Sequence, residues 1–170
     1  EQASARAGVL LRDPAWAFRD AGWIAPGAFA AWFLRTAAVP VTWCGGTTVH
    51  TLAREGAEWC LLDATGAQIA RAPTVVLANA GDALRLAGAA GWPVQPVRGQ
   101  VSFAPAGGLL LPRLPVAGSG YVLPCVAGQA VFGATAQPGD ADAGVRLDDH
   151  RENLEKLARL LGDPALHSTI

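Results

Sequence analysis

The sequence predicts an α/β protein in two parts, because a short helical segment over residues 82–89 separates two groups of short strands. Apolar residues at three- and four-residue steps predict a helix near residue 26, and alternating patterns predict strands over residues 41–80 and again from residue 94. Hydrophobic residues make up 51% of the chain and charged residues 16%, a balance that excludes disorder. The same balance indicates more exposed apolar surface than a free-standing domain usually carries. We therefore expect part of this surface to be covered by residues outside this chain.

Helical signals dominate the first 40 residues. Residues 1–7 are compatible with the end of a helix, and residues 15–25 with irregular or extended chain. Pro26 suits the first turn of the next helix, where no backbone N–H is required. An apolar stripe on one face of that helix is formed by Phe29, Trp32, Phe33 and Ala37. Pro40 then ends the helix.

Residues 41–80 carry strand patterns. The segments VTWC, TTVHTL, AEWCLLDA and QIARA, with a turn at Thr65 and Gly66, predict a three-stranded antiparallel meander. The continuous apolar run TVVLANA at 74–80 instead predicts a strand buried on both faces, as in a parallel sheet. The sequence contains no second run of this kind, so we expect the parallel neighbours of that strand to lie outside these 170 residues.

A second antiparallel sheet is predicted after a short helix over residues 82–89. VQPVRGQVSF at 94–103 favours one long strand, and LLLP, GYVLPC and QAVFGAT follow with Gly and Pro at their joints. Asp149 and Glu152 then form a capping-box pattern ahead of leucines at helical spacing. This pattern predicts an amphipathic helix that ends at Gly162 and Pro164, of which Pro164 lies outside the residues that the structure describes.

Composition excludes several classes of function. No run approaches the roughly 20 apolar residues of a membrane span, and the first residues lack a signal-peptide pattern, which predicts a soluble cytoplasmic protein without membrane contact. Three widely spaced cysteines with no His at ligand spacing predict no metal site. A net charge of -1 gives no electrostatic signal for nucleic acid. Met is absent even at position 1, so we expect a partial sequence.

Two segments are hard to explain by packing alone. In APTVVLANAGDA at 72–83, a strand ends in small residues just before a helix, where the backbone could closely approach a flat cofactor. In PVQPVRGQVSF at 93–103, Arg98, Gly99 and Gln100 place a cation, a gap and an amide in an otherwise apolar strand. Both segments are therefore candidate parts of a functional site.

Ordered blocks along the chain carry a resemblance to a known family. DAGWIAPGAF, TVVLANAGDA, PVRGQVSF, SGYVLP, VFGAT and DDHRENLEKL resemble the D-amino-acid oxidase superfamily, most closely the FAD-dependent C-terminal domain of bifunctional tRNA-modifying enzymes. The resemblance runs from about residue 13 to 161. It implies a D-amino-acid-oxidase-like α/β fold, present in part. Residues 26–90 would belong to an incomplete flavin lobe, and residues 8–25 and 91–170 to an antiparallel substrate lobe.

The same resemblance implies a reaction of the complete enzyme. FAD would be the cofactor and tRNA the substrate, and the carboxymethyl group of a carboxymethylaminomethyl-uridine at the wobble position would be removed oxidatively. A separate methyltransferase domain of the same protein, using S-adenosylmethionine, would then methylate the amine. The alternatives are an oxidase of small amino acids such as glycine or sarcosine, and a non-enzymatic binding domain of the same fold.

Position by position, the resemblance implies residue roles. It assigns cofactor contacts to Val49, Ala78, Asn79, Ala80, Gly81 and Gly99. It assigns substrate contacts to Arg98, Gln100 and Tyr121, and it identifies no catalytic group. The family's usual glycine position is held by Ala80, with Gly81 one place later, which is a departure from the pattern. Tyr121 has an ordinary alternative role, which is to fill the sheet.

Two family elements are not found in the sequence. These are the GxGxxG turn that holds the FAD pyrophosphate on a helix N-terminus, and a later arginine-bearing strand that pairs with the substrate carboxylate. We therefore expect the chain alone to be inactive and not to retain FAD. Exposed strand edges also predict self-association.

Overall fold

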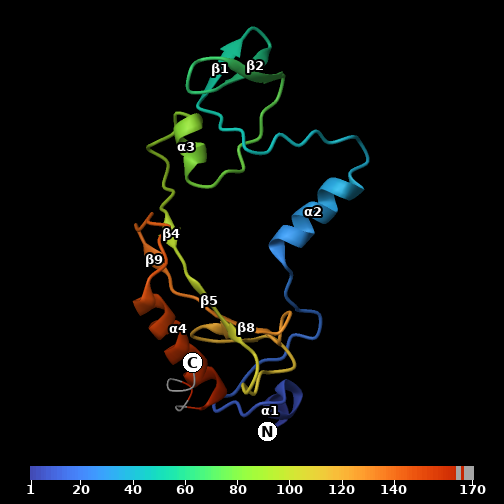
Figure 1. Ribbon diagram of the computed structural model, residues 1–170, viewed down its shortest axis with the longest axis vertical. Coiled ribbons are helices and arrows are strands. Elements are labelled where there is room, and N and C mark those ends of the chain that lie inside the picture. The colour runs from blue at the N-terminus through green and yellow to red at the C-terminus, as the bar shows by residue number, and fades with distance from the viewer. Residues whose placement is uncertain (164–165, 167–170) are drawn as a thin grey trace. The chain divides into compact units, whose positions relative to one another are not determined.

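A computed structural model describes residues 1–163 and 166. The chain divides into two compact units (Figure 1). Unit 1 consists of Glu1–Ala30 with Val97–Ile170, and unit 2 of Ala31–Pro96. The assignment of a flavin and a substrate lobe to parts of the chain stays a prediction. Among the described residues, no helix has both the length and the apolar character that crossing a membrane requires.

Unit 1 is built on an antiparallel sheet. Its strands are, in spatial order, β5 (Val101–Pro105), β8 (Gln129–Gly133), β7 (Tyr121–Val122) and β6 (Val116–Ala117). Smaller elements of this unit are α1 (Gln2–Ala7), β4 (Val97–Arg98) and β9 (Gln137–Pro138), and β4 pairs with β9. The predicted second antiparallel sheet is confirmed, although LLLP contributes no strand to it.

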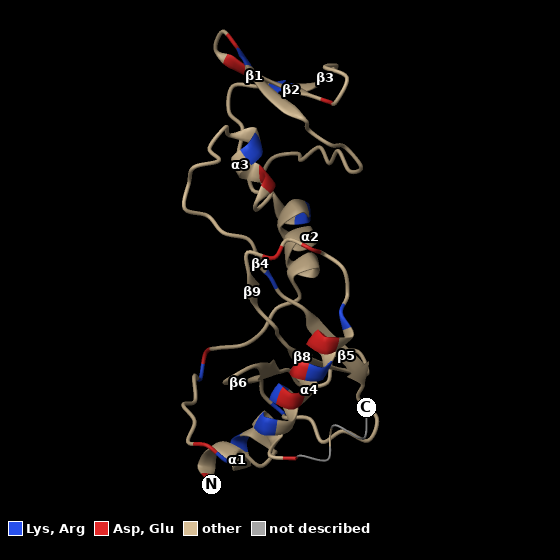
Figure 2. Ribbon diagram, turned by 90° about the vertical axis from the view of Figure 1, so that its left-hand side faces the viewer, with Lys and Arg blue, Asp and Glu red and all other residues tan. Residues whose placement is uncertain are grey.

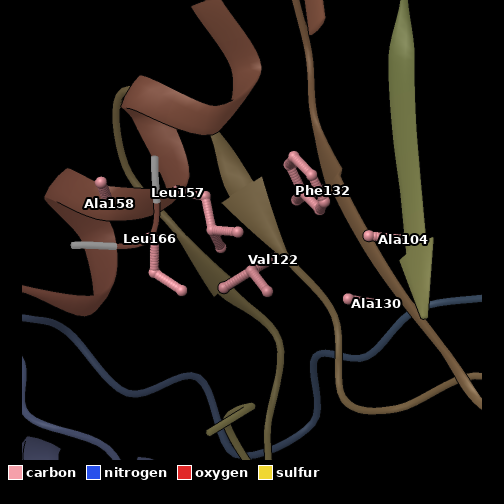
Figure 3. Packing of buried hydrophobic residues seen from close by; sticks show 7 residues of the cluster. All are labelled: Ala104, Val122, Ala130, Phe132, Leu157, Ala158 and Leu166. Carbon is pink, nitrogen blue, oxygen red and sulfur yellow. The ribbon is translucent and has the colours of Figure 1, made fainter. Parts of the chain in front are cut away.

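Helix α4 (Leu147–Leu161) covers one face of this sheet, and the two enclose the core of unit 1 (Figure 3). Phe132 of β8, Val122 of β7 and Leu157 of α4 are each at most 2% exposed. Smaller side chains complete the cluster, namely Ala104, Ala130, Ala158 and Leu166. Burial of this one apolar stripe holds the helix on the sheet.

The end of α4 is predicted correctly and its beginning is not. Gly162 adopts the left-handed conformation (φ 64°) and its N–H bonds the carbonyl oxygen of Arg159 at 3.3 Å, as expected of a glycine after a helix. The helix begins at Leu147, however, and no side chain caps its extended N-cap residue, Arg146. The predicted capping box is wrong because the Asp149 carboxylate pairs with Arg98 instead.

The long strand predicted over residues 94–103 is interrupted. Its two parts, β4 and β5, belong to different sheets, and residues 99 and 100 lie between them. At this break the backbone N–H of Gln100 donates to the Thr135 hydroxyl at 3.1 Å, and the Thr135 N–H donates to the Gln100 carbonyl at 3.2 Å. These two hydrogen bonds between Gln100 and Thr135 thus take the place of the continuous backbone pairing that one long strand would have.

Unit 2 contains the predicted meander, which is confirmed. It comprises β1 (Thr51–Glu55), β2 (Glu58–Leu62) and β3 (Gln68–Ala72), paired antiparallel in this order. At the predicted turn, Asp63 Oδ1 accepts bonds from the N–H groups of Thr65 (2.8 Å) and Ala67 (3.0 Å), and Gly66 has φ 83°. The segment VTWC at 41–44 forms no strand.

Two helices were also expected between residues 26 and 89. Helix α2 (Pro26–Thr36) begins at Pro26 and ends before Pro40, as predicted, and it crosses the boundary between the units. Helix α3 (Asp82–Leu86) is present but is shorter than the predicted span of 82–89.

The buried strand predicted over residues 74–80 is not formed. No described strand pairs with this segment, so it has no ladder to join. Val75 and Leu77 are half-buried whereas Val76 is 82% exposed. One face of the segment is therefore partly covered by other residues and the other face is exposed. A strand inside a parallel sheet would have both faces covered.

The core of unit 1 gives a direct test of how α4 is held. Leu157→Ala should lower the free energy of unfolding by about 2–5 kcal/mol, because it removes a buried side chain and leaves a cavity. Leu147→Ala, on the same helix but 72% exposed, should change it by less than about 0.5 kcal/mol. Urea unfolding followed by circular dichroism would measure both variants, and equal effects would contradict this packing.

Candidate functional site

Three of the residues assigned to the cofactor lie together in unit 2. Val49, Ala78 and Asn79 line an open groove of about 390 Å³. Its walls include residues 47–49 and 75–79. The walls are completed by apolar side chains of the meander and by side chains of α3, namely Leu52, Leu61, Asp82 and Leu86.

The groove has a mixed lining of apolar and polar residues. Most of its lining residues are aliphatic, and the polar ones are Thr47, Thr48, Asn79 and Asp82. An apolar concave surface with a few polar groups is typical of small-molecule and cofactor sites. Cofactor contacts for Val49, Ala78 and Asn79 stay a prediction.

Ala80 and Gly81 follow the groove wall directly and lead into α3. Ala80 has φ 53°, the left-handed region that disfavours a side chain, and its carbonyl accepts the N–H of Ala83 at 3.0 Å. The position where the family has glycine therefore keeps the backbone conformation that suits glycine. Ala80 preserves the turn at a cost in strain.

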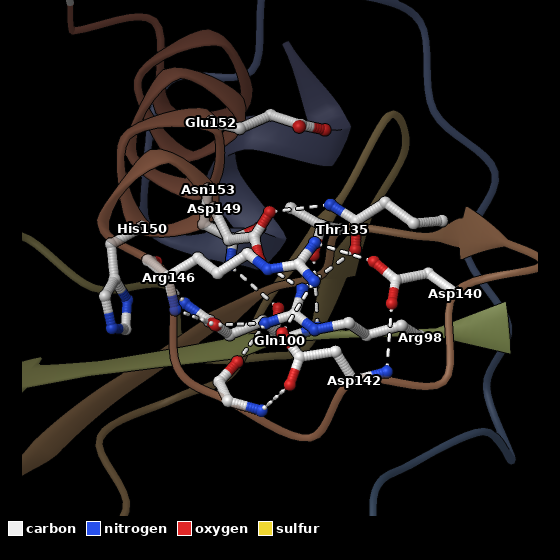
Figure 4. Close-up of polar contacts among 12 residues, drawn as sticks. Arg98, Gln100, Thr135, Asp140, Asp142, Arg146, Asp149, His150, Glu152 and Asn153 are labelled. Atoms are coloured by element: carbon white, nitrogen blue, oxygen red, sulfur yellow. Dashed lines mark hydrogen bonds and ion pairs between the residues drawn. The ribbon is translucent and has the colours of Figure 1, made fainter.

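The three candidate substrate residues lie in unit 1, and two of them, Arg98 and Gln100, belong to a buried polar network (Figure 4). Arg98 is 9% exposed and forms a buried ion pair with Asp149. Its guanidinium also donates to Gln137 Oε1 (2.9 Å), Gln100 Oε1 (2.9 Å) and the Gly144 carbonyl oxygen (2.5 Å). Both terminal nitrogens of Arg98 thus donate hydrogen bonds to acceptors in unit 1.

Gln100 extends this network to the start of α4. Its Oε1 also accepts the backbone N–H of Arg146, and its Nε2 donates to the Arg146 carbonyl, both at 2.8 Å. The side chain of Gln100 therefore pairs with the main chain just before the helix. Substrate contacts for Arg98 and Gln100 stay a prediction. Within unit 1, both side chains form hydrogen bonds that connect the break between β4 and β5 to the start of α4.

Electrostatics follow from these contacts. The hydrogen bond from Arg98 lowers the pKa of Asp149 from its ordinary value, and Gln137 assists. Asp140 and Asp142 pair with Arg146 at 2.6 Å and 2.8 Å, and these hydrogen bonds lower the pKa of both carboxyls. The carboxylates around the network therefore stay ionised at neutral pH.

The other two predicted residues of unit 1 are placed differently. A Cβ atom at Gly99 would lie 3.2 Å from the Thr135 carbonyl oxygen, so close backbone approach accounts for the glycine. Tyr121 is half-buried on β7, opposite Gly133 of β8. No hydrogen bond joins Tyr121 to Arg98 or Gln100 in the part of the chain that the structure describes. Unit 1 thus contains four of the predicted residues without gathering them around one pocket.

Sequence reasoning missed a second polar cluster beside Gln100. Asn153 is fully buried and its Nδ2 donates to the Gln100 carbonyl (2.8 Å) and the Ser102 hydroxyl (3.0 Å). Ser102 Oγ lies 2.7 Å from Nδ1 of His150. Because Asn153 already donates to Ser102, the hydroxyl hydrogen is available for His150. The sequence signal was present: Asp149 and Asn153 occupy the same face of α4 as Leu157.

Comparison with known proteins assigns the chain to a family. Residues 1–170 match the family described as FAD dependent oxidoreductase. The chain belongs to this family of FAD-dependent oxidoreductases. Glycine oxidase from Geobacillus kaustophilus has a similar structure, with a TM-score of 0.57 and 25% identity over 71% of this chain and 32% of that one. The D-amino-acid-oxidase-like fold is therefore confirmed, with a part of it present here.

Curated members of this family of FAD-dependent oxidoreductases are also similar in sequence. The tRNA 5-methylaminomethyl-2-thiouridine biosynthesis bifunctional protein MnmC of Burkholderia thailandensis is 44% identical over 154 residues, which is 90% of this chain and 24% of that protein. The protein of the same name from Methylibium petroleiphilum is 42% identical over 168 residues, 94% of this chain and 25% of that protein. The chain spans about a quarter of the length of these relatives.

The strain at Ala80 can be measured. Ala80→Gly should raise the free energy of unfolding by about 0.5–1 kcal/mol, because glycine tolerates a positive φ without the steric cost of a Cβ. Ala83→Gly, inside α3, should lower it by about 1 kcal/mol. Urea unfolding would compare the two, and destabilisation by both would contradict the left-handed turn.

The buried pair between Arg98 and Asp149 can be tested against an exposed pair on the same helix. Asp149→Asn should lower the unfolding midpoint clearly, because it leaves a buried guanidinium without a counter-charge. Asp148→Asn is the matched control, since its 88% exposed carboxylate pairs with Arg151 at the surface and should contribute little. Thermal melts of both variants at pH 7 would show the difference.

The same pair predicts a pH dependence of stability. Asp149 has a lower pKa in the folded chain than the value of about 3.9 in the unfolded one. The stabilisation is therefore present above about pH 4 and is lost as the pH falls through the folded pKa. Urea midpoints from pH 6 to pH 2 should fall less steeply in Asp149→Asn than in the unaltered chain. Parallel curves would contradict this assignment.

Proposed function

We propose that the protein containing this chain is an FAD-dependent oxidoreductase that removes the carboxymethyl group from carboxymethylaminomethyl-uridine at the wobble position of tRNA. The observation that carries the proposal is similarity at 38–50% identity to proteins named for tRNA 5-methylaminomethyl-2-thiouridine biosynthesis. The family match over the whole chain supports flavin-dependent oxidation as the type of reaction.

The groove of unit 2 supports a role in cofactor binding. Val49 and the 75–79 segment would hold the adenine end, and the left-handed turn at Ala80 would bring the backbone close to the cofactor. Bound FAD would supply the oxidant, accepting a hydride from the carbon beside the substrate nitrogen. Oxidation at the carboxymethyl carbon, with loss of the N–H proton, would give an imine of the substrate, and its hydrolysis by water would release glyoxylate and free the aminomethyl group of the uridine.

Unit 1 would contribute to orientation of the substrate. Tyr121 carries the one phenol of the chain and could donate a hydrogen bond to the substrate carboxylate. Arg98 and Gln100 would act mainly by holding α4 and the 144–146 loop in place. We also infer a cytoplasmic location. The relatives are named bifunctional, which supports a second activity in the same protein, and the family resemblance implies that this activity is a methyltransferase.

A second candidate is an oxidase of small amino acids. The observation that favours it is the structural similarity to glycine oxidase, which covers 71% of this chain. The two candidates share flavin chemistry and differ in whether the amine is attached to tRNA. A non-enzymatic binding domain of this fold would show neither activity.

The tRNA proposal is tested in cells lacking the gene that encodes this chain. Mass spectrometry of nucleosides from their tRNA should show accumulation of the carboxymethylaminomethyl form of the wobble uridine. Restoring the gene should remove this accumulation. Unchanged nucleosides would refute the tRNA proposal, and loss of glycine or sarcosine oxidation in the same cells would favour the amino-acid oxidase.

The chain on its own should purify colourless. After incubation with excess FAD and gel filtration, we expect the protein fraction to show no visible flavin absorbance. The reason is that the described residues include no glycine-rich turn at a helix N-terminus to hold the pyrophosphate. Absorption spectroscopy measures this directly. A stable yellow complex would contradict the expectation.

A further inference from the structure

Helix α3 carries an ion pair at the edge of the groove in unit 2. Arg85 donates to Asp82 through Nε (2.7 Å) and Nη2 (2.9 Å). The same guanidinium reaches across to the main chain before β1, where Nη1 donates to the His50 carbonyl at 2.6 Å and Nη2 lies 3.4 Å from the Val49 carbonyl. One side chain therefore connects α3 to the wall that contains Val49.

Asp82 connects the same pair to the opposite wall. Its Oδ2 accepts a hydrogen bond from Asn79 Nδ2 at 3.3 Å, and Asn79 ends the 75–79 stretch. A continuous path thus runs from the Val49 and His50 carbonyls through Arg85 and Asp82 to Asn79. Figure 2 shows the two opposite charges on this short helix.

The wall that Arg85 reaches has little other support. The N–H of His50 donates to the Leu62 carbonyl at 2.8 Å, and β1 begins at the next residue. Residues 47–49 form no strand, and among the described residues no backbone hydrogen bond ties them to the meander. Among the described residues, the end of this stretch is therefore held by the His50 bond to Leu62 and by the bonds from Arg85 to the His50 and Val49 carbonyls.

Energetics separate a positioning role from a stabilising one. The Arg85 and Asp82 side chains are 47% and 52% exposed, and ion pairs with this much exposure contribute little to folding stability. The planar guanidinium can bond a carboxylate and two carbonyls at once, whereas a lysine ammonium is a single point of charge. The benefit of arginine at this place is geometrical.

We propose that Arg85, oriented by Asp82, is a positioning residue that sets the Val49 main chain against the 75–79 wall and so shapes the groove for an adenine nucleotide. The proposal rests on the function proposed above for this groove. It predicts that loss of Arg85 weakens binding of the adenine portion while leaving the fold of unit 2 intact.

The test compares three variants of the 170-residue chain. Arg85→Gln removes the charge and the fork, and Arg85→Lys keeps the charge alone. Arg54→Gln is the matched control, because Arg54 is an exposed arginine of the same unit that donates to the Gly56 carbonyl at 3.0 Å and does not line the groove. Each variant is titrated with adenosine monophosphate, and with flavin mononucleotide as a ligand without adenine, while amide signals are followed by NMR.

We expect adenosine monophosphate to bind the unaltered chain weakly and saturably, with shifts at Val49 and Asn79. Arg85→Gln should reduce its affinity about 5- to 10-fold, which corresponds to the net loss of about one ordinary hydrogen bond. Hydrogen exchange at the His50 amide should become faster in that variant. Arg85→Lys should recover part of the affinity, and the thermal midpoint should stay close to that of Arg54→Gln.

The possible failures are distinguishable. If the unaltered chain binds adenosine monophosphate and Arg85→Gln behaves like Arg54→Gln in affinity and exchange, the positioning role is wrong. If Arg85→Gln lowers the thermal midpoint well below that of Arg54→Gln, the loss of affinity reflects a loss of folding stability. The role of Arg85 is then structural, and the proposal is also wrong. If the unaltered chain shows no binding, or binds flavin mononucleotide equally, the adenine assignment of the groove itself fails.

Discussion

The arrangement of unit 1 depends on the buried ion pair between Arg98 and Asp149. Two charges with 7% and 5% exposed side chains are costly to remove from water, and the cost is offset only where every donor and acceptor finds a partner. Gln100, Gln137 and the Gly144 carbonyl provide those partners. The network fixes the break between β4 and β5 to the first turn of α4, so it sets the register of the helix on the sheet.

Unit 2 shows a different solution, in which exposed polar contacts shape a surface. Its meander is held by a regular ladder, whereas the walls of its groove lie outside any strand and are joined through α3. The Arg85–Asp82 pair is too exposed to stabilise the fold strongly, yet it determines where two main-chain stretches lie. Stability and site geometry are thus supplied by separate groups of residues.

The residues that the family resemblance assigns to the cofactor and to the substrate fall mostly in different units. Residues assigned to the cofactor occur mostly in unit 2, and those assigned to the substrate occur in unit 1. The chain spans about a quarter of the relatives' length, so its residues are expected to provide a corresponding part of a site. Aliphatic side chains dominate the groove of unit 2, with a few polar residues among them, as is typical of small-molecule sites.

The sequence by itself determined the meander, helix α2, the C-terminal end of α4 and the antiparallel sheet, because each is written in local periodicity and turn residues. Ordered blocks also determined the family. Only the tertiary structure decided that Asp149 leaves its predicted cap to pair with Arg98, 51 residues away, and that residues 74–80 join no sheet. Pairing of a buried charge and availability of a strand neighbour depend on residues distant in the chain, which local patterns do not record.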